Sequence, residues 1–100
     1  MLLHSVYFWL RQDLNEDERN QFCQGLVKLR RISSVVDLYV GKPAKTEKRQ
    51  IIDDSYTYGL IVLFNDVKGH DEYQSHPIHK EFLASFSSFW SKVLVYDIQV

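Results

Sequence analysis

Residues Leu2 to Leu10 are apolar or aromatic at almost every position, on both sets of alternating residues. Alternate side chains of an extended strand point to opposite faces of a sheet. Residues 56–64 repeat this pattern, except at Thr57 and at Gly59, where a glycine within a strand suggests close approach by a neighbour. A sheet built around these two segments would be apolar on both faces, so it must be covered on both sides.

The segment after the first strand has the features of an amphipathic helix. Asn15, with Glu18 three residues later, matches a capping box, in which each side chain bonds the backbone N–H of the other residue. Phe22, Leu26 and Leu29 then fall on one face at helical spacing. We expect this helix to end near residues 30–33.

A proline divides the second helical region. A short helix is predicted to begin after Asn65 or Asp66 and to carry Tyr73. Pro77 disfavours helical geometry at His76 but suits the first turn of a new helix. That new helix would present large side chains at intervals of three and four residues, namely His79, Phe82, Leu83, Phe86, Phe89 and Trp90.

Two further strands, at residues 35–40 and 93–100, complete the pattern. The charged residues 42–54 favour a solvated connection between two strands. The order strand, helix, strand, strand, divided helix, strand is typical of a ferredoxin-like α+β fold, with helices on one side of a four-stranded antiparallel sheet. We expect one domain over residues 1–100.

Charge and cysteine content argue against several classes of function. Twelve Lys and Arg residues against thirteen Asp and Glu residues give a net charge of −1, so the broad basic surface of a non-specific nucleic-acid binder is missing. The one cysteine, Cys23, can form neither an intramolecular disulfide nor a multi-cysteine zinc module. The N-terminal residues show no signal-peptide pattern and no long apolar run. We therefore expect a cytoplasmic protein without nucleic-acid or membrane partners.

Helices on one side leave the other apolar face of the sheet without cover. A second copy of the same sheet is the simplest cover, because two sheets packed about a twofold axis would bury this face in both subunits. The sequence therefore predicts a homodimeric α+β barrel. Its interface would bury about 1,500 Å², the usual size for a stable complex.

Several motifs occur together along the chain. They are residues 3–8 (LHSVYF), 56–58 (YTY) with Phe64, 73–79 (YQSHPIH) and 88–97 (SFWSKVLVYD). The most specific is Tyr-x-x-His-Pro-x-His, followed about ten residues later by Ser-Phe-Trp. Together these motifs resemble the stress-responsive A/B barrel (Dabb) family, and the resemblance covers essentially the whole chain. Members of that family are dimeric α+β barrels, in agreement with the dimer expected from the strand faces.

The resemblance also suggests site residues. One plant branch of the family consists of polyketide cyclases, which close a poly-β-keto chain without a metal or organic cofactor. By similarity to that branch, His79 matches the catalytic histidine, Tyr73 matches the tyrosine that works with it, and His4 matches a histidine on the first strand. The cyclases place a pocket tyrosine on their first helix, where this chain has Leu26. The resemblance therefore implies no cofactor and leaves the substrate open, since many members have no known activity.

These residues could carry acid–base chemistry. An imidazole such as His79 titrates near neutrality, so it can remove a proton from an activated carbon and return it to a carbonyl oxygen. A phenol such as Tyr73 can donate a hydrogen bond to the developing oxyanion. The alternative is structural, with His79 contacting a ligand or the core and Tyr73 packing with its hydroxyl satisfied. The acid–base hypothesis requires the bend at His76 and Pro77 to bring both side chains to one cavity.

We expect that cavity to be lined on its other sides by His4, Val6, Phe8, Leu26 and Trp90. No metal site is predicted. Of the four histidines, His76 and His79 have a spacing compatible with shared coordination, but Pro77 lies between them and no carboxylate completes a known ligand pattern.

Two functions of different classes are compatible with these features. The first is a homodimeric barrel that binds a small hydrophobic molecule bearing a carbonyl or phenol group, with cofactor-independent acid–base chemistry at His79 as its sharper form. The alternative is a non-enzymatic stress-response or self-assembly protein without a substrate. A solvent-filled space beside His79 would favour the first, and solid packing there would favour the second.

Overall fold

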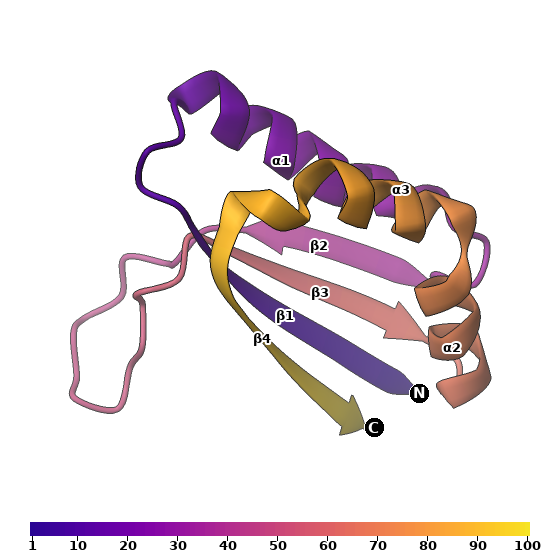
Figure 1. The fold of residues 1–100 in the computed structure, drawn as a ribbon. Coiled ribbons are helices and arrows are strands. Elements are labelled where there is room, and N and C mark those ends of the chain that lie inside the picture. The colour runs from indigo at the N-terminus through magenta and orange to yellow at the C-terminus, as the bar shows by residue number, and fades with distance from the viewer.

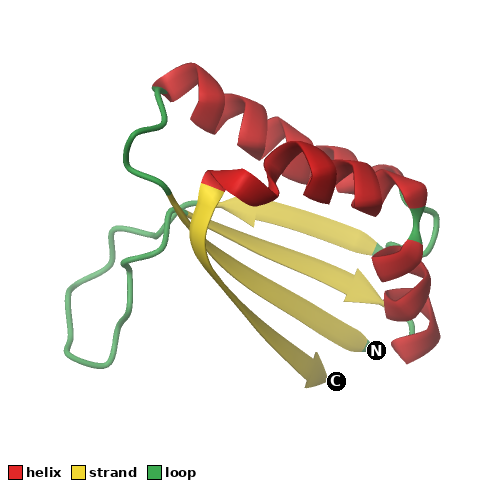
Figure 2. Ribbon diagram, viewed as in Figure 1, coloured by secondary structure: helices red, strands yellow, loops and turns green.

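A computed structural model describes residues 1–100 as an antiparallel sheet with helices on one face only (Figures 1 and 2). The four strands lie in the order β2-β3-β1-β4. They are β1 (Leu2–Leu10), β2 (Asp37–Gly41), β3 (Tyr58–Phe64) and β4 (Trp90–Gln99). The helices are α1 (Glu16–Lys28), α2 (Val67–Ser75) and α3 (Pro77–Phe86), with short 3-10 helices η1 (Leu29–Arg31) and η2 (Ser87–Phe89). This confirms the predicted ferredoxin-like order of elements.

The first helix begins at the predicted capping box. The Oδ1 atom of Asn15 accepts a hydrogen bond from the backbone N–H of Glu18 at 2.8 Å, and Oε1 of Glu18 accepts one from the backbone N–H of Asn15 at 3.0 Å. Both bonds satisfy donors that the first turn of a helix leaves free. The apolar face of α1 then buries Phe22 and Leu26 completely against the sheet.

The break between α2 and α3 lies at the predicted proline. His76 has extended backbone angles, and its Nδ1 atom accepts a hydrogen bond from the backbone N–H of Ile78 at 3.1 Å. His76 therefore caps α3, while Pro77 occupies the first turn, where no backbone N–H is needed.

Several strand boundaries differ from those predicted. β2 begins at Asp37 rather than at residue 35, β3 at Tyr58 rather than at residue 56, and β4 at Trp90 rather than at residue 93. The last difference is the largest, because α3 ends at Phe86 and the chain has become extended at Trp90, which pairs with Leu10 of β1. The predicted connection, residues 42–54, contains no helix or strand.

The two faces of the sheet differ in their cover. The inner face of β1 and β3 is buried beneath the helices, whereas their outer face is half-buried at most positions and has no helix over it (Figure 1). Tyr39, Tyr96 and Ile98, also on the outer face, are more than half exposed. A Cβ atom at Gly59 would meet the rings of Tyr7 and Tyr56 at ordinary contact distance, so the expected close approach is not observed. None of the helices combines the length and the apolarity needed to cross a bilayer.

Candidate functional site

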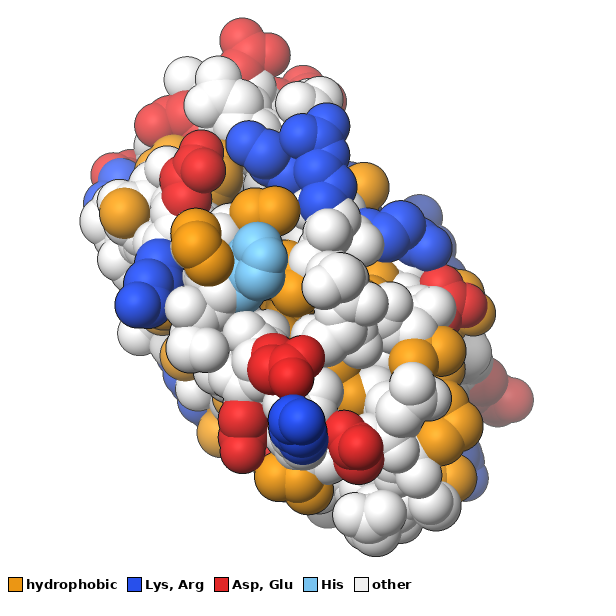
Figure 3. All heavy atoms as spheres, turned by 90° about the vertical axis from the view of Figure 1, so that its right-hand side faces the viewer, with side chains coloured by type: hydrophobic (Ala, Val, Ile, Leu, Met, Phe, Trp, Pro, Cys, Tyr) orange, Lys and Arg blue, Asp and Glu red, His pale blue; other side chains and the backbone are white.

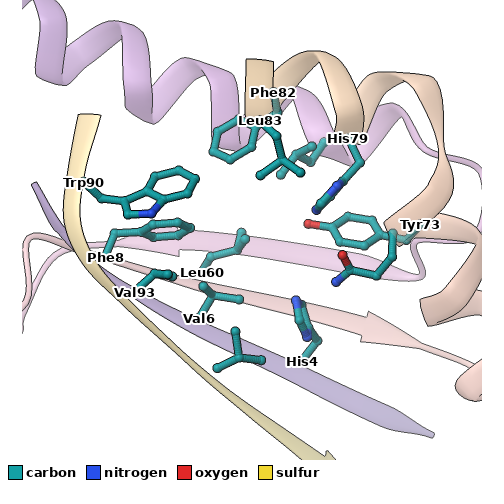
Figure 4. A pocket seen from close by; sticks show the side chains of 13 residues that line it. His4, Val6, Phe8, Leu60, Tyr73, His79, Phe82, Leu83, Trp90 and Val93 are labelled. Atoms are coloured by element: carbon teal, nitrogen blue, oxygen red, sulfur yellow. The ribbon is translucent and has the colours of Figure 1, made fainter. Parts of the chain in front are cut away.

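A pocket of about 200 Å³ lies between the inner face of the sheet and α3 (Figure 4). Most of its lining is apolar and consists of Val6, Phe8, Leu29, Leu60, Phe82, Leu83, Trp90, Val93 and Val95. The remaining lining residues are His4, Tyr73, Gln74 and His79. Figure 4 shows His4, Tyr73 and His79 at one end of the pocket and the rings of Phe8 and Trp90 at the other. A ligand would therefore meet one polar end and one aromatic end.

The helix break brings Tyr73 and His79 to the same cavity. On one continuous helix, residues six positions apart would be rotated by about 240° and would face different directions. The bend at His76 and Pro77 removes this constraint, and the two ring centroids lie 4.7 Å apart with the ring planes at 62°. Figure 4 shows the imidazole turned toward the tyrosine ring and the tyrosine hydroxyl pointing into the cavity.

The surroundings of His79 favour its neutral form. The side chain is buried, and Nδ1 has no hydrogen-bond partner. Burial lowers the pKa of His79, and the nearby His4 and His70 lower it further. At neutral pH, His79 is therefore an uncharged imidazole able to accept a proton.

Tyr73 has the opposite chemical role available to it. Its side chain is almost fully buried, and its hydroxyl forms no hydrogen bond with a protein group, unlike the hydroxyls of Tyr39 and Tyr58. Burial strongly raises the pKa of this phenol, so it stays protonated and can act as a hydrogen-bond donor. The pocket therefore places a proton acceptor beside a hydrogen-bond donor, with both groups free of protein partners.

His4 reaches the polar end of the pocket from β1. Its Nδ1 atom lies 2.5 Å from Oδ1 of Asp97, the residue directly opposite on β4. Burial lowers the pKa of His4 and outweighs the opposing effect of Asp97. The imidazole centroid lies 5.9 Å from that of Tyr73, which places the two rings edge to face.

The other residues expected in the cavity are distributed as follows. Val6, Phe8 and Trp90 line the pocket, and Trp90 stacks with Phe82 at a centroid distance of 6.1 Å. Trp90 reaches the pocket from the start of β4 and not from a helix. Leu26 does not line the pocket, and Leu29, three residues later, lines it instead, although both side chains are buried in the core.

Sequence reasoning missed Asp97 and His70 as members of this region. The missing information was the pairing register of β1 and β4, which places Asp97 opposite His4. The ring of His70, on α2, lies 5.0 Å from that of His4. One potential metal-binding atom from each of His4, His70 and Asp97 lies within 4.8 Å of the others. By contrast, His76 uses its ring nitrogen to cap α3 and does not form a pair with His79.

The chain is similar to known proteins over nearly its whole length. A family model described as the stress responsive A/B barrel domain matches residues 2–100. Olivetolic acid cyclase of Cannabis sativa is 30% identical over 95 residues, covering 94% of this chain and 91% of the cyclase. A stress-response A/B barrel domain-containing protein of Arabidopsis thaliana is 26% identical, covering 97% of this chain and 84% of that protein. The crystal structure of a dimeric ferredoxin-like protein of unknown function from Thermobifida fusca matches with a TM-score of 0.80 at 18% identity, over 99% of this chain and 90% of that one.

Proposed function

Because the chain belongs to the stress responsive A/B barrel (Dabb) family, we propose that it binds a small hydrophobic molecule bearing a carbonyl or phenol group and carries out cofactor-independent acid–base chemistry on it. The observation that carries this proposal is the pairing of His79 and Tyr73 at one end of an otherwise apolar pocket. Similarity to olivetolic acid cyclase over almost the whole chain supports the same class of reaction. The pocket volume of about 200 Å³ suits a small aromatic or short-chain molecule, since sites for drug-sized ligands span about 300–1,000 Å³.

The proposed reaction is an aldol-type ring closure. His79 removes a proton from a carbon next to a carbonyl group, and the resulting enolate carbon attacks a second carbonyl carbon of the same molecule. One carbon–carbon bond forms, and the electron pair of the attacked C=O moves to its oxygen. Tyr73 donates a hydrogen bond to this oxyanion, and the proton held on His79 then returns to it. No oxidant, reductant or metal is needed for this sequence.

The apolar end of the pocket would determine which molecules fit. Phe8, Phe82 and Trp90 form an aromatic wall around the inner part of the cavity. This wall suits an alkyl or aryl substituent, because burial of apolar surface is favourable and forms no directional bonds. The reactive carbonyl groups would then lie near His79 and Tyr73.

A non-enzymatic self-assembly protein is the competing function. That hypothesis expects aromatic side chains to fill the space beside His79 completely. The pocket next to His79 and the unpartnered hydroxyl of Tyr73 favour ligand binding over this alternative. We retain self-association as part of the function, since a homodimer would cover the apolar outer face of the sheet. The Thermobifida fusca relative of the same fold is described as dimeric, which supports this proposal.

Proton abstraction can be tested before the natural substrate is known. Phenylacetone carries an aromatic group and a ketone with an activated CH₂, so its deuterium uptake in D₂O can be followed by NMR with and without the protein. We expect the wild type to accelerate exchange, His79→Ala to lose at least about 90% of this acceleration, and Tyr73→Phe to be intermediate. His76→Asn removes a different histidine while keeping a good helix cap, so it should behave like the wild type.

Binding and reaction are separated by a second measurement on the same samples. Chemical shifts of pocket amides, such as those of Val95 and Leu83, would report occupancy by the ketone. Occupancy with equal exchange in the wild type and His79→Ala would remove His79 from the chemistry and leave a binding protein. Absence of both occupancy and exchange, for phenylacetone and for a panel of aromatic polyketide-like compounds, would favour the self-assembly alternative.

A further inference from the structure

We propose that His4, His70 and Asp97 form a binding site for a divalent transition-metal ion, with Zn²⁺ the preferred ion, beside the polar end of the pocket. Each residue offers one ligand atom, and these atoms lie within 4.8 Å of one another. The site shares His4 with the lining of the pocket but uses neither His79 nor Tyr73, and it does not depend on the reaction proposed above.

The three groups come from three different elements. His4 lies on β1, Asp97 on β4 and His70 on α2. The antiparallel register places His4 and Asp97 directly opposite each other, which brings Nδ1 and Oδ1 to 2.5 Å. The third group comes from α2, whose N-cap Asp66 bonds the backbone N–H of Gly69 next to His70. Regular secondary structure therefore holds all three groups.

The donor set indicates the class of metal. Two imidazoles and one carboxylate suit Zn²⁺ and other first-row transition ions, whereas Mg²⁺ and Ca²⁺ prefer sites made only of oxygen atoms. Three protein ligands are one fewer than a closed tetrahedral site requires, so the fourth position would be free for water or a ligand. An ion about 2.1 Å from each ligand would replace the proton between His4 and Asp97 and move these atoms slightly apart.

Neighbouring groups can orient one of the ligands. Oδ1 of Asp71 lies 3.1 Å from Nδ1 of His70, and Nε2 of Gln74 lies 3.5 Å from Nε2 of the same ring, so an ion bound at Nε2 would displace this long amide contact. A carboxylate behind the distal nitrogen of a ligating histidine is a common feature of metal sites, since it fixes the tautomer and makes the ligand more basic.

The cluster is reachable from solvent. His4 is buried, but the side chain of His70 is 18% exposed and that of Asp97 is 42% exposed. The end of the molecule where α2 and both chain termini lie faces the viewer in Figure 3, and acidic side chains gather on this surface. An ion could therefore enter without unfolding the domain.

Titration calorimetry with Zn²⁺ tests this site on protein freed of metal by chelation and carrying no polyhistidine tag. We expect one ion per chain with a Kd in the micromolar range or below, and visible d–d absorption of a low-coordinate complex when Co²⁺ replaces Zn²⁺. His70→Gln and Asp97→Asn should each raise the Kd by at least about 10–100-fold. His76→Asn is the matched control, since it also removes one histidine but keeps the cap of α3.

Two results would overturn the site. One is the absence of saturable Zn²⁺ binding by the wild type at micromolar concentrations of protein and metal. The other is unchanged affinity in His70→Gln, because binding would then lie elsewhere. His70→Gln keeps a polar side chain on the surface of α2, and its circular dichroism spectrum would verify folding. If Asp97→Asn fails to fold, the difference in Zn²⁺ affinity between His70→Gln and His76→Asn still tests whether His70 binds the ion.

Discussion

Replacement of His79 by phenylalanine should stabilise the protein while abolishing any proton transfer. The Nδ1 atom of His79 is buried without a hydrogen-bond partner, and an unsatisfied buried polar atom costs about 1–3 kcal/mol. Phenylalanine keeps the edge-to-face contact with Tyr73, and its extra volume can extend into the adjoining pocket. We expect a gain of about 1 kcal/mol, the lower end of that range, which corresponds to a rise in Tm of about 4–8 °C for a chain of this length.

Urea unfolding followed by circular dichroism would measure this difference. Wild type and variant must be compared at equal protomer concentration, because the proposed dimerisation would make apparent stability depend on concentration. Phe82→Leu is the control, since it alters another side chain of the same pocket that carries no polar atom. That control should lose about 1 kcal/mol. Equal or lower stability of His79→Phe would show that Nδ1 has a partner in solution and would refute the argument from an unpaired nitrogen.

The same pair of proteins tests the lowered pKa of His79. Burial lowers this pKa in the folded state, whereas the unfolded chain has the ordinary value of about 6.5. The unfolded chain therefore binds the proton more readily, so stability is retained above about pH 6.5 and lost as the pH falls through the lowered pKa. His4, whose pKa burial also lowers, is present in both proteins. The stability advantage of His79→Phe should therefore widen in acid, and a constant difference would contradict the pKa argument.

Four further substitutions test the fold and the dimer. Asn15→Ala removes the capping box and should cost about 1 kcal/mol in urea unfolding. Gly25→Ala should give no net stabilisation, because the added Cβ would lie 2.5 Å from the ring of Phe86. Gly69→Ala meets only ordinary contacts, so it should gain up to about 1 kcal/mol of stability from helix propensity. Equal gains in stability for the two variants would be inconsistent with the tight contact between α1 and α3. Ile61→Lys places a charge on the outer face of the sheet. In light scattering, the wild type should have the mass of a dimer, twice 11.9 kDa, and the variant should have the mass of a monomer. A monomeric wild type would refute the proposed interface.

The sequence correctly predicted the helix ends that are set by interactions between residues close together in the chain. The Asn15 and Glu18 side chains act on backbone groups only three residues away, and Pro77 acts on the residue before it. The start of β4 was not predictable in this way. Phe86, Phe89 and Trp90 have helical spacing, yet the chain leaves the helix after Phe86 because Trp90 pairs with Leu10 across the sheet. A tertiary contact thus overrides the local periodicity.

In the candidate site, too, local sequence motifs were informative, whereas contacts between distant residues were not predictable. The motif at residues 73–79 contains both Tyr73 and His79, and the resemblance to the family singled out this pair. Its geometry was not predictable, because the angle between α2 and α3 depends on how each helix packs. Asp97 is 93 residues from His4 and joins it only through the register of two strands. Leu26 and Leu29 share a helical face and are equally buried, so neither their spacing nor their burial identifies Leu29 as the one that lines the pocket.

The pocket and the proposed dimer interface share a structural cause in β4. This edge strand pairs with β1 alone, and the helices do not cover it fully (Figure 1). On its inner face Val93 and Val95 are 39% and 48% exposed, and both line the pocket. On its outer face Tyr96 is 57% exposed. A ligand would cover the inner face of β4, and a second subunit would cover its outer face. Each would therefore stabilise the same strand from an opposite side. Because binding to the folded state adds to its stability, occupancy of either surface would stabilise the folded position of β4.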